Sequence, residues 1–402
     1  MRSTYIISAF AGLALAAPHP QDIEFDQVDA APDPTIVTPP VLGASATVSI
    51  QPTAAVATVA DASVTEVAST NSTETNDKRD FLDFLGKRDG NCAVQPKGTG
   101  PTVNTPDDTP ASFLAYQPFQ TTATNAATPQ GYTQSFVNLQ GSSQTVSWLG
   151  YTTLSSYDTV ACASYCDQLD GCQAFNIYYE RDPTEDPNAT SCPNPPSLTN
   201  IKCSRWGVQI TADTAVNTGQ NRDSFQVVIA GSNGYNKNAP PPAQTGFTGP
   251  VELGGAINAP NDPVTNTNTY MGYKFFSFGQ VQTYPAGVQA CTLACTAQTA
   301  YNSRHPPSTG KPNVCNQVVV YVLSDENDPK GIYCAMYSEE WAQNYATNYG
   351  QYRGSDYWSV SQAYAYTNAT YSAAYGPICA VGGCPSGSYR GGNCGGWGTG
   401  NC

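Results

Sequence analysis

The sequence of 402 residues contains few charged residues, few histidines and few methionines. Asp, Glu, Lys and Arg make up 12% of it, about half of the roughly 25% typical of soluble globular domains, and there are only 2 His and 3 Met. The abundant residues are instead 35 Gly, 31 Pro, 25 Tyr and 14 Cys. This composition excludes a coiled coil, a helical bundle and a polytopic membrane protein, and it indicates a loop-rich, β-rich chain held by cross-links.

Positive charge and long apolar runs are also scarce. Seventeen basic residues stand against 31 acidic ones, for a net charge of -14. This charge argues against a protein that binds nucleic acid or anionic membranes through a basic surface. No run of 18 or more apolar residues occurs in the sequence, so we expect no membrane span.

The first 88 residues are predicted to be a signal peptide and a propeptide, which are removed during maturation. Residues 1–16 combine Arg2, a short apolar stretch and an Ala-x-Ala pattern, which is typical of a secretory signal peptide. Residues 17–88 are rich in Ala, Thr, Val, Pro and Asp, and we expect a disordered propeptide. Dibasic pairs end at Arg79 and Arg88 and predict cuts by a processing protease, with chance clustering of basic residues as the alternative.

The cysteines predict disulfides rather than a metal site. Their number is even, all 14 follow residue 88, and a secretory route is oxidising. No Cys-x-x-Cys pair occurs, and residues 89–402 hold one histidine, His305, in a His-Pro-Pro sequence that favours an exposed loop. We therefore expect neither a metal nor another cofactor.

The order of the cysteines reveals an internal duplication. Each copy has a Gly-Tyr pair, a Cys-x-x-x-Cys pair, two later cysteines and a Gly-Gln-x-Arg string. The first copy contains Cys162, Cys166, Cys172, Cys203 and residues 219–222, and the second contains Cys291, Cys295, Cys315, Cys334 and residues 350–353. Sixteen residues separate the last cysteine from the glycine of the string in both copies.

Each copy is expected to contain one short helix and several strands. Cysteines at i and i+4 share one face of a helix, with Asp158 as a plausible N-cap in the first copy. Alternating or continuous apolar residues over 174–179 and 318–323 predict strands. Residues 328–331, Asp-Pro-Lys-Gly, predict the turn of a hairpin.

This arrangement resembles the PAN/apple module, a curled antiparallel sheet around one helix. Tandem modules of similar pattern occur in secreted fungal proteins that are described, by analogy, as carbohydrate-binding-like. The resemblance implies an α+β, β-rich fold with Cys166–Cys172 and Cys162–Cys203 bridges, and likewise Cys295–Cys315 and Cys291–Cys334. Four cysteines allow three pairings per module, so other pairings stay open. The partners of Cys92, Cys192, Cys379, Cys384, Cys394 and Cys402 cannot be assigned from sequence.

The expected domain organisation follows from these features. It comprises a signal peptide (1–16), a disordered propeptide (17–88), an N-terminal extension (89–130), module 1 (131–235), a Pro-rich linker (236–262), module 2 (263–371) and a Gly- and Cys-rich tail (372–402). Sequons at Asn188 and Asn368 are candidate glycosylation sites. Glycans and abundant uncharged polar residues would then replace charge as the source of solubility.

Candidate ligand-binding residues stand in the duplicated string and beside it. Arg222 and Arg353 can anchor a carboxylate or a cluster of sugar hydroxyls, and Tyr352, Trp358 and Trp397 can supply a stacking surface. We expect Trp358 and Trp397 to be exposed. The alternative for each arginine is a structural pair with a local carboxylate, which a shared fold would also repeat.

Catalytic and metal-binding patterns are weak. Glu339-Glu340-Trp341 suggests a glycosidase, but adjacent carboxylates do not readily form a facing pair. Residues 325–328, Asp-Glu-Asn-Asp, could bind calcium but lack the other features of a known calcium loop, which favours a solvated turn. The sequence therefore predicts a secreted or wall-associated, non-catalytic protein that binds extracellular polysaccharide or glycoprotein. The alternatives are a structural or host-interacting surface protein with protein partners and a carbohydrate-active enzyme.

Overall fold

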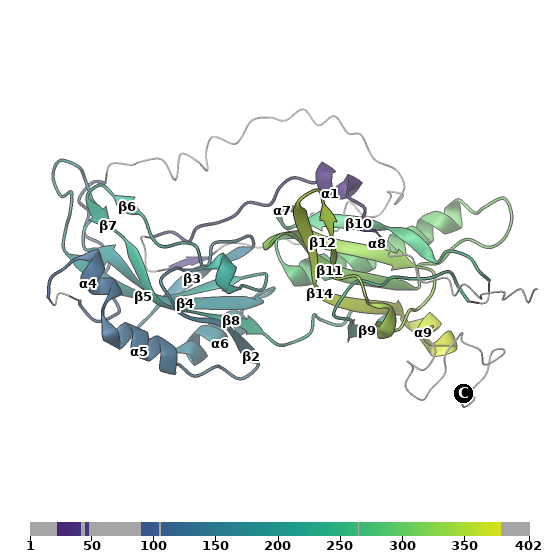
Figure 1. Ribbon diagram of the computed structural model, residues 1–402, viewed down its shortest axis with the longest axis horizontal. Helices are drawn as coiled ribbons and strands as arrows, with labels where there is room; N and C mark the ends of the chain where they lie inside the picture. Colours follow the sequence, from purple (N-terminus) through teal and green to yellow (C-terminus); the bar gives the residue numbers. More distant parts are fainter. Residues whose placement is uncertain (1–21, 42–44, 48–89, 104–105, 264, 379–402) are drawn as a thin grey trace, which may run out of the picture.

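The computed structural model describes residues 22–41, 45–47, 90–103, 106–263 and 265–378 (Figure 1). The expected signal peptide, the processing positions Arg79 and Arg88, Trp397 and the last four cysteines lie outside these residues. Within them the chain is β-rich, with antiparallel strands in two large sheets and few helices. No helix of the described part is both long and apolar enough to cross a membrane.

The first sheet has six strands in the order β1-β3-β5-β4-β8-β2. The strands are β1 (Ser45–Thr47), β2 (Tyr132–Leu139), β3 (Trp148–Leu154), β4 (Ala174–Pro183), β5 (Ser197–Trp206) and β8 (Val228–Lys237). A separate two-stranded hairpin joins β6 (Asn221–Arg222) to β7 (Phe225–Gln226). The β4 strand is buried along its whole length because both faces of this sheet are covered.

The second sheet repeats this topology. Its strands are β9 (Phe247–Glu252), β10 (Tyr270–Ser277), β11 (Gln317–Asp325), β12 (Asp328–Tyr337), β13 (Gly350–Arg353) and β14 (Asp356–Asn368). The order β10-β12-β11-β14, with β9 on the far edge of β14, matches β3-β5-β4-β8 with β2 on the far edge of β8. The duplication seen in the cysteines is thus a duplication of the sheet.

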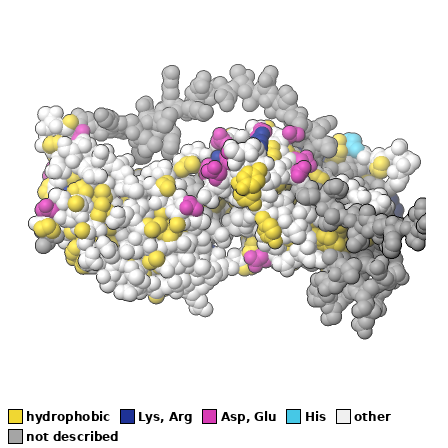
Figure 2. Space-filling view, viewed as in Figure 1, with side chains coloured by type: hydrophobic (Ala, Val, Ile, Leu, Met, Phe, Trp, Pro, Cys, Tyr) yellow, Lys and Arg dark blue, Asp and Glu magenta, His cyan; other side chains and the backbone are white. Residues whose placement is uncertain are grey.

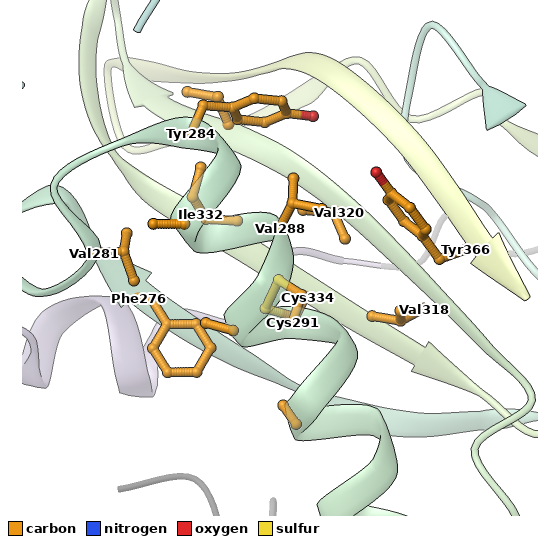
Figure 3. Packing of buried hydrophobic residues seen from close by; sticks show 14 of the residues in the cluster. Phe276, Val281, Tyr284, Val288, Cys291, Val318, Val320, Ile332, Cys334 and Tyr366 are labelled. Atoms are coloured by element: carbon orange, nitrogen blue, oxygen red, sulfur yellow. A yellow bond between two sulfur atoms is a disulfide. The ribbon is translucent and has the colours of Figure 1, made fainter. Parts of the chain in front are cut away.

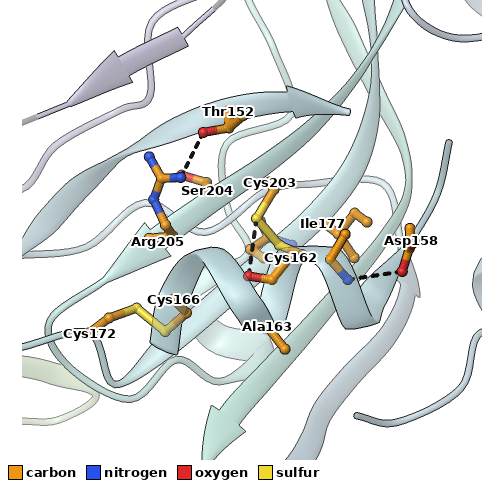
Figure 4. The surroundings of a disulfide bond; sticks show 12 residues. Thr152, Asp158, Cys162, Ala163, Cys166, Cys172, Ile177, Cys203, Ser204 and Arg205 are labelled. Atoms are coloured by element: carbon orange, nitrogen blue, oxygen red, sulfur yellow. Dashed lines mark hydrogen bonds between the residues drawn. A yellow bond between two sulfur atoms is a disulfide. The ribbon is translucent and has the colours of Figure 1, made fainter. Parts of the chain in front are cut away.

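One helix of each copy packs on one face of its sheet and is fixed there by disulfides. These helices are α6 (Thr159–Asp167) and α8 (Tyr284–Arg304). As expected, Asp158 caps α6, because its carboxylate accepts a hydrogen bond from the Ala161 amide at 2.9 Å (Figure 4). The second helix has 21 residues and is far longer than the short helix that was predicted.

The cores lie between these helices and their sheets. In module 2, alternate residues of β11, among them Val318 and Val320, pack with Val288 and Cys291 of α8 (Figure 3). In module 1, Ile177 of β4 packs with the cysteines of α6. Continuous apolar runs therefore form central strands, as the sequence predicts, because both faces of such a strand are buried.

Five disulfides join the ten cysteines of the described residues. Four are the bridges implied by the resemblance: Cys295–Cys315, Cys291–Cys334 (Figure 3), and Cys162–Cys203 with Cys166–Cys172 (Figure 4). The fifth, Cys92–Cys192, was not assignable from sequence because the bonded residues are 100 positions apart. It joins the expected N-terminal extension to an insert of module 1.

Two expected boundaries differ from the structure. The extension 89–130 contains α4 (Pro110–Leu114) and α5 (Gln117–Asn125), which contribute Phe113 and Phe119 to the module 1 core. The expected linker 236–262 contains β9, which pairs with β14 and so belongs to the second sheet. Short strands and helices at module edges have little sequence signal of their own, because their pairing with distant strands decides their structure.

The modules contact each other directly. The amide of Tyr284, at the start of α8, donates a hydrogen bond to the Gly207 carbonyl of module 1 at 2.9 Å. Val146 and Val208 of module 1 join the apolar cluster around α8. The start of the second helix therefore packs against loops of the first module.

Candidate functional site: equivalent sheet faces under one N-terminal segment

Residues 22–41, which the sequence analysis placed in a disordered propeptide, are ordered and cover the sheet faces opposite to the helices. We call this stretch the N-terminal strap. Residues 22–34 lie on module 2 and include α1 (Asp26–Ala30), and residues 37–41 lie on module 1 (Figure 1). The expectation of disorder was wrong for this stretch because composition does not reveal a distant surface on which a few apolar residues can pack.

The strap binds module 2 through its apolar residues. Ile23 and Val28 are 4% and 8% exposed and pack against the face that carries Tyr273, Tyr321 and Tyr333. The three tyrosine rings stack in a ladder, with centroid distances of 4.7 Å and 5.0 Å. Full burial of such an aliphatic side chain contributes about 1.5–3 kcal/mol, so the two residues together can hold a segment that has no stable structure alone.

Side chains of module 2 also bond the strap's backbone. The Tyr333 and Tyr273 hydroxyls accept hydrogen bonds from the Glu24 and Gln27 amides at 3.1 and 2.9 Å. Gln351 accepts from the Ile23 amide at 2.6 Å and donates to its carbonyl at 3.0 Å. Burial raises the pKa of both tyrosines, so these hydroxyls remain protonated at neutral pH.

The predicted ligand residues of module 2 meet the strap at the β13–β14 hairpin. Arg353 binds the Asp29 carboxylate through two hydrogen bonds of 2.6 Å, and its guanidinium lies 4.7 Å from the Phe25 ring centroid. These hydrogen bonds lower the pKa of Asp29. Trp358 is 8% exposed and packs edge-on against Phe25 at 4.9 Å, so the expectation that it is exposed was wrong: the strap covers it. Tyr352 is 73% exposed.

Arg222, the counterpart of Arg353, has a different partner. It binds Asp186 of its own module at 2.5 Å and is only 20% exposed. This is the local structural pair that the sequence analysis gave as the alternative. Arg353, Tyr352 and Trp358 thus lie on one hairpin, where Arg353 and Trp358 contact the strap and the exposed Tyr352 packs on Tyr357. Arg222 lies in the other module, and Trp397 lies outside the described residues.

The face of module 1 that corresponds to the tyrosine ladder is charged. Strand register places Lys202 of β5 where module 2 has Tyr333, and Glu180 of β4 where it has Leu323. Lys202 and Glu180 form a salt bridge, and their side chains are 0% and 1% exposed. The strap covers this pair, and its Pro40 and Val41 carbonyls each accept a hydrogen bond from the Lys202 Nζ at 2.9 Å. This pair was not predicted from the sequence, because the partners meet only through strand register.

Electrostatics around this pair favour a charged lysine. Burial disfavours the ammonium, but the carboxylates of Glu180 and Asp182 outweigh it and raise the pKa of Lys202. Burial and the neighbouring Asp182 raise the pKa of Glu180, since two buried carboxyl groups share one cation. The Asn200 side chain donates a 2.7 Å hydrogen bond to Asp182.

A cavity lies beneath the strap on each module. The one on module 1 has about 110 Å³ and is lined by residues that include Val41, Asp182 and Asn200. The one on module 2 has about 360 Å³ and is lined by Asp29, Asp33, Asp325, Lys330 and Trp358, among others. Figure 2 shows acidic and basic side chains gathered over the region where Figure 1 draws α1. Two of the three carboxylates in the larger cavity belong to the strap.

The duplicated Gly-Gln-x-Arg string has a structural role in both modules. The amides of Gly219 and Gly350 bond to the side-chain oxygens of Asn217 and Asn348 at 3.2 and 3.0 Å. Both glycines have positive φ, and a Cβ at either would lie 2.1–2.2 Å from a carbonyl oxygen of the facing strand. The repeated unit is therefore Asn-x-Gly-Gln-x-Arg, one residue pair longer than the string recognised from the sequence.

We expect Gly350→Ala to destabilise module 2 by about 2–3 kcal/mol, because an alanine here combines an unfavourable φ with a backbone clash. Gly354→Ala is the matched control: it also has positive φ, at 68°, but no atom lies within 4 Å of its Cβ position. The control should lose about 1–2 kcal/mol. Chemical denaturation of both variants measures the difference, and equal losses would contradict the role assigned to the clash.

The structure also places the residues that were considered for catalysis and for calcium binding. Trp341 is 1% exposed and donates to Thr269, so it is no sugar platform, and burial raises the pKa of its neighbour Glu340. The turn between β11 and β12 lies at Glu326 and Asn327, three residues before the expected one, because Asp325 pairs with Asp328. No cluster of three metal-ligating side chains occurs among the described residues.

The two predicted glycosylation sites lie at turns. Asn188 is half-buried, and its side chain donates to the Gly90 carbonyl at 2.7 Å. Asn368 is also half-buried and caps α9 (Ala369–Tyr375) by accepting hydrogen bonds from the Thr370 and Tyr371 amides. Glycosylation of either residue stays a prediction.

In comparisons with known proteins, no family model, no curated protein and no solved structure matches this chain.

Proposed function

We propose that this is a secreted, non-catalytic binding protein whose two PAN/apple-like modules recognise extracellular or cell-wall glycans or glycoproteins. The observation that carries the proposal is the β13–β14 hairpin. There Tyr352, 73% exposed, lies 5.0 Å from the Tyr357 ring and next to Arg353 in sequence. Exposed aromatic rings suit stacking on sugars, whereas the Arg353 guanidinium is already bound to Asp29 of the strap. The disulfides support an oxidising, extracellular location.

A non-catalytic role is also consistent with the carboxylates. In the larger cavity Asp29 and Asp33 come from the strap, and Asp325 is the only carboxylate there that belongs to module 2. If the processing cuts at Arg79 or Arg88 release the strap, a carboxylate pair for glycoside hydrolysis would not persist in this cavity. A carbohydrate-active enzyme is therefore disfavoured.

Binding to insoluble chitin, β-glucan and cellulose tests the proposal. The full chain should be retained on at least one of them, and Tyr352→Ala should lower the affinity about 2- to 10-fold, the range expected from one aromatic contact. Tyr165→Ala is the matched control, because Tyr165 is a tyrosine 42% exposed on α6 of the other module. Retention no greater than that of an unrelated protein would overturn glycan recognition.

Protein partners are the second candidate function. The observation that favours them is that the tyrosine face of module 2 already holds a peptide segment, residues 22–31, whose backbone amides donate hydrogen bonds to side chains of that face. Cross-linking on intact cells distinguishes the candidates, since recovery of wall glycan alone would disfavour a protein partner.

A further inference from the structure

The strap binds module 2 through side-chain contacts, in the way that a peptide binds a receptor. The second sheet is complete without it, because the strands of that sheet pair only with one another. The strap adds no strand there, and its backbone is held by side-chain groups of Tyr273, Tyr333 and Gln351. In return, the Gln27 side chain of the strap bonds to the backbone of β10, donating to the Tyr273 carbonyl and accepting from the Phe275 amide.

The contacts define a short recognition pattern. Apolar side chains at 23, 25 and 28 face the ladder and Trp358, and the carboxylate at 29 meets Arg353. The Arg353–Asp29 pair joins residues 324 positions apart. Its counterpart in module 1, Arg222, is occupied by a carboxylate of its own module. Only in module 2, therefore, is the arginine of the duplicated unit held by the strap.

The geometry points to a peptide-binding site on the tyrosine face of module 2. We propose that this site takes a short acidic peptide with apolar residues at positions i, i+2 and i+5 and a carboxylate at i+6. Residues 22–34 of the chain are its resident occupant in cis, and they can be exchanged for a peptide of the same chemistry supplied in trans. This inference does not depend on glycan recognition.

Competition between the strap and an added peptide tests the site in the full chain. The probe is a fluorescein-labelled peptide of residues 22–34, followed by fluorescence anisotropy. In the wild-type chain the strap competes at high effective concentration, so the probe should bind weakly. In a chain with Phe25→Ala and Asp29→Asn the strap is weakened, and the probe should bind at least about tenfold more tightly.

Two controls make the result specific. A chain with Asp22→Asn changes charge as Asp29→Asn does, but it leaves the Arg353–Asp29 pair intact, so probe binding should equal that of the wild type. Probes that carry Phe25→Ala or Asp29→Asn should bind the weakened chain at least about fivefold less tightly than the wild-type probe. The chain with Asp29→Asn alone serves if the double variant fails to fold.

The proposal is overturned if the probe does not bind a folded, strap-weakened chain, or if all probes bind it equally. The first outcome would make the strap an integral part of module 2. The second would make the binding nonspecific. Neither outcome bears on retention by glycans, which is measured without a peptide.

Discussion

Replacing Lys202 with Met is expected to lower the free energy of unfolding of module 1 by about 3–5 kcal/mol. The substitution leaves the Glu180 carboxylate buried, at 1% exposure, without its cation, with Asp182 close by. Removing one partner of a buried pair costs far more than the pair contributes, because the remaining charge keeps its desolvation penalty. Urea denaturation followed by circular dichroism measures the loss.

The second module supplies the compensating change. It carries Leu323 and Tyr333 at the positions of Glu180 and Lys202, so the same sheet face can be apolar. We expect Glu180→Leu combined with Lys202→Met to recover part of the lost stability, because the buried Asp182 still loses its cation. Lys330→Met is the matched control: its partner Asp328 lies at 2.8 Å in a partly exposed pair, and the loss should be at most about 1 kcal/mol. A double variant as unstable as the single one would contradict this account.

The same pair has a defined pH dependence. The pKa of Lys202 is raised above the ordinary lysine value of 10.5 despite burial, because of the neighbouring carboxylates. The charged lysine therefore stabilises the fold fully below pH 10.5, and this contribution is lost as the pH rises through the higher pKa of the folded state. The Met variant lacks this alkaline loss.

Local sequence signals predicted much of each module. The Cys-x-x-x-Cys pairs mark helices because cysteines at i and i+4 share a face, and Asp158 caps the first of them. The apolar run at 318–323 lies in a central strand, because a strand that is buried on both faces is apolar along its length. Equal spacing from the last cysteine to the glycine of the string anticipated the matched topology of the sheets.

Features that depend on distant pairing were missed. Lys202 meets Glu180 through strand register, and the strap residue Asp29 meets Arg353 across 324 positions. The composition of residues 17–88 predicted that they do not fold alone, but the surface that orders Ile23 belongs to another part of the chain. Trp358 was expected to be exposed for the same reason: nothing near it in the sequence covers it.

Removing the long disulfide of either module is expected to cost about 4 kcal/mol, and removing the short one in module 1 about 2 kcal/mol. The difference follows from the chain entropy that each bridge removes from the unfolded state. Cys291–Cys334 and Cys162–Cys203 connect residues 43 and 41 positions apart, whereas Cys166–Cys172 spans only 6. The prediction applies to replacement of both cysteines of a bridge by Ala, with stability measured by urea denaturation.

The duplication provides an internal control for this entropic argument. The two long bridges occupy equivalent places between helix and central strand, and all four cysteines are fully buried, so the cost of the cavities should be similar. Cys295–Cys315 takes the place of the short bridge but spans 20 positions, so its removal should cost about 1 kcal/mol more than removal of Cys166–Cys172. If the stability losses correlate with the burial of the cysteines and not with their sequence separation, packing of the sulfur atoms accounts for the stabilisation. The entropy of the unfolded chain would then not account for it.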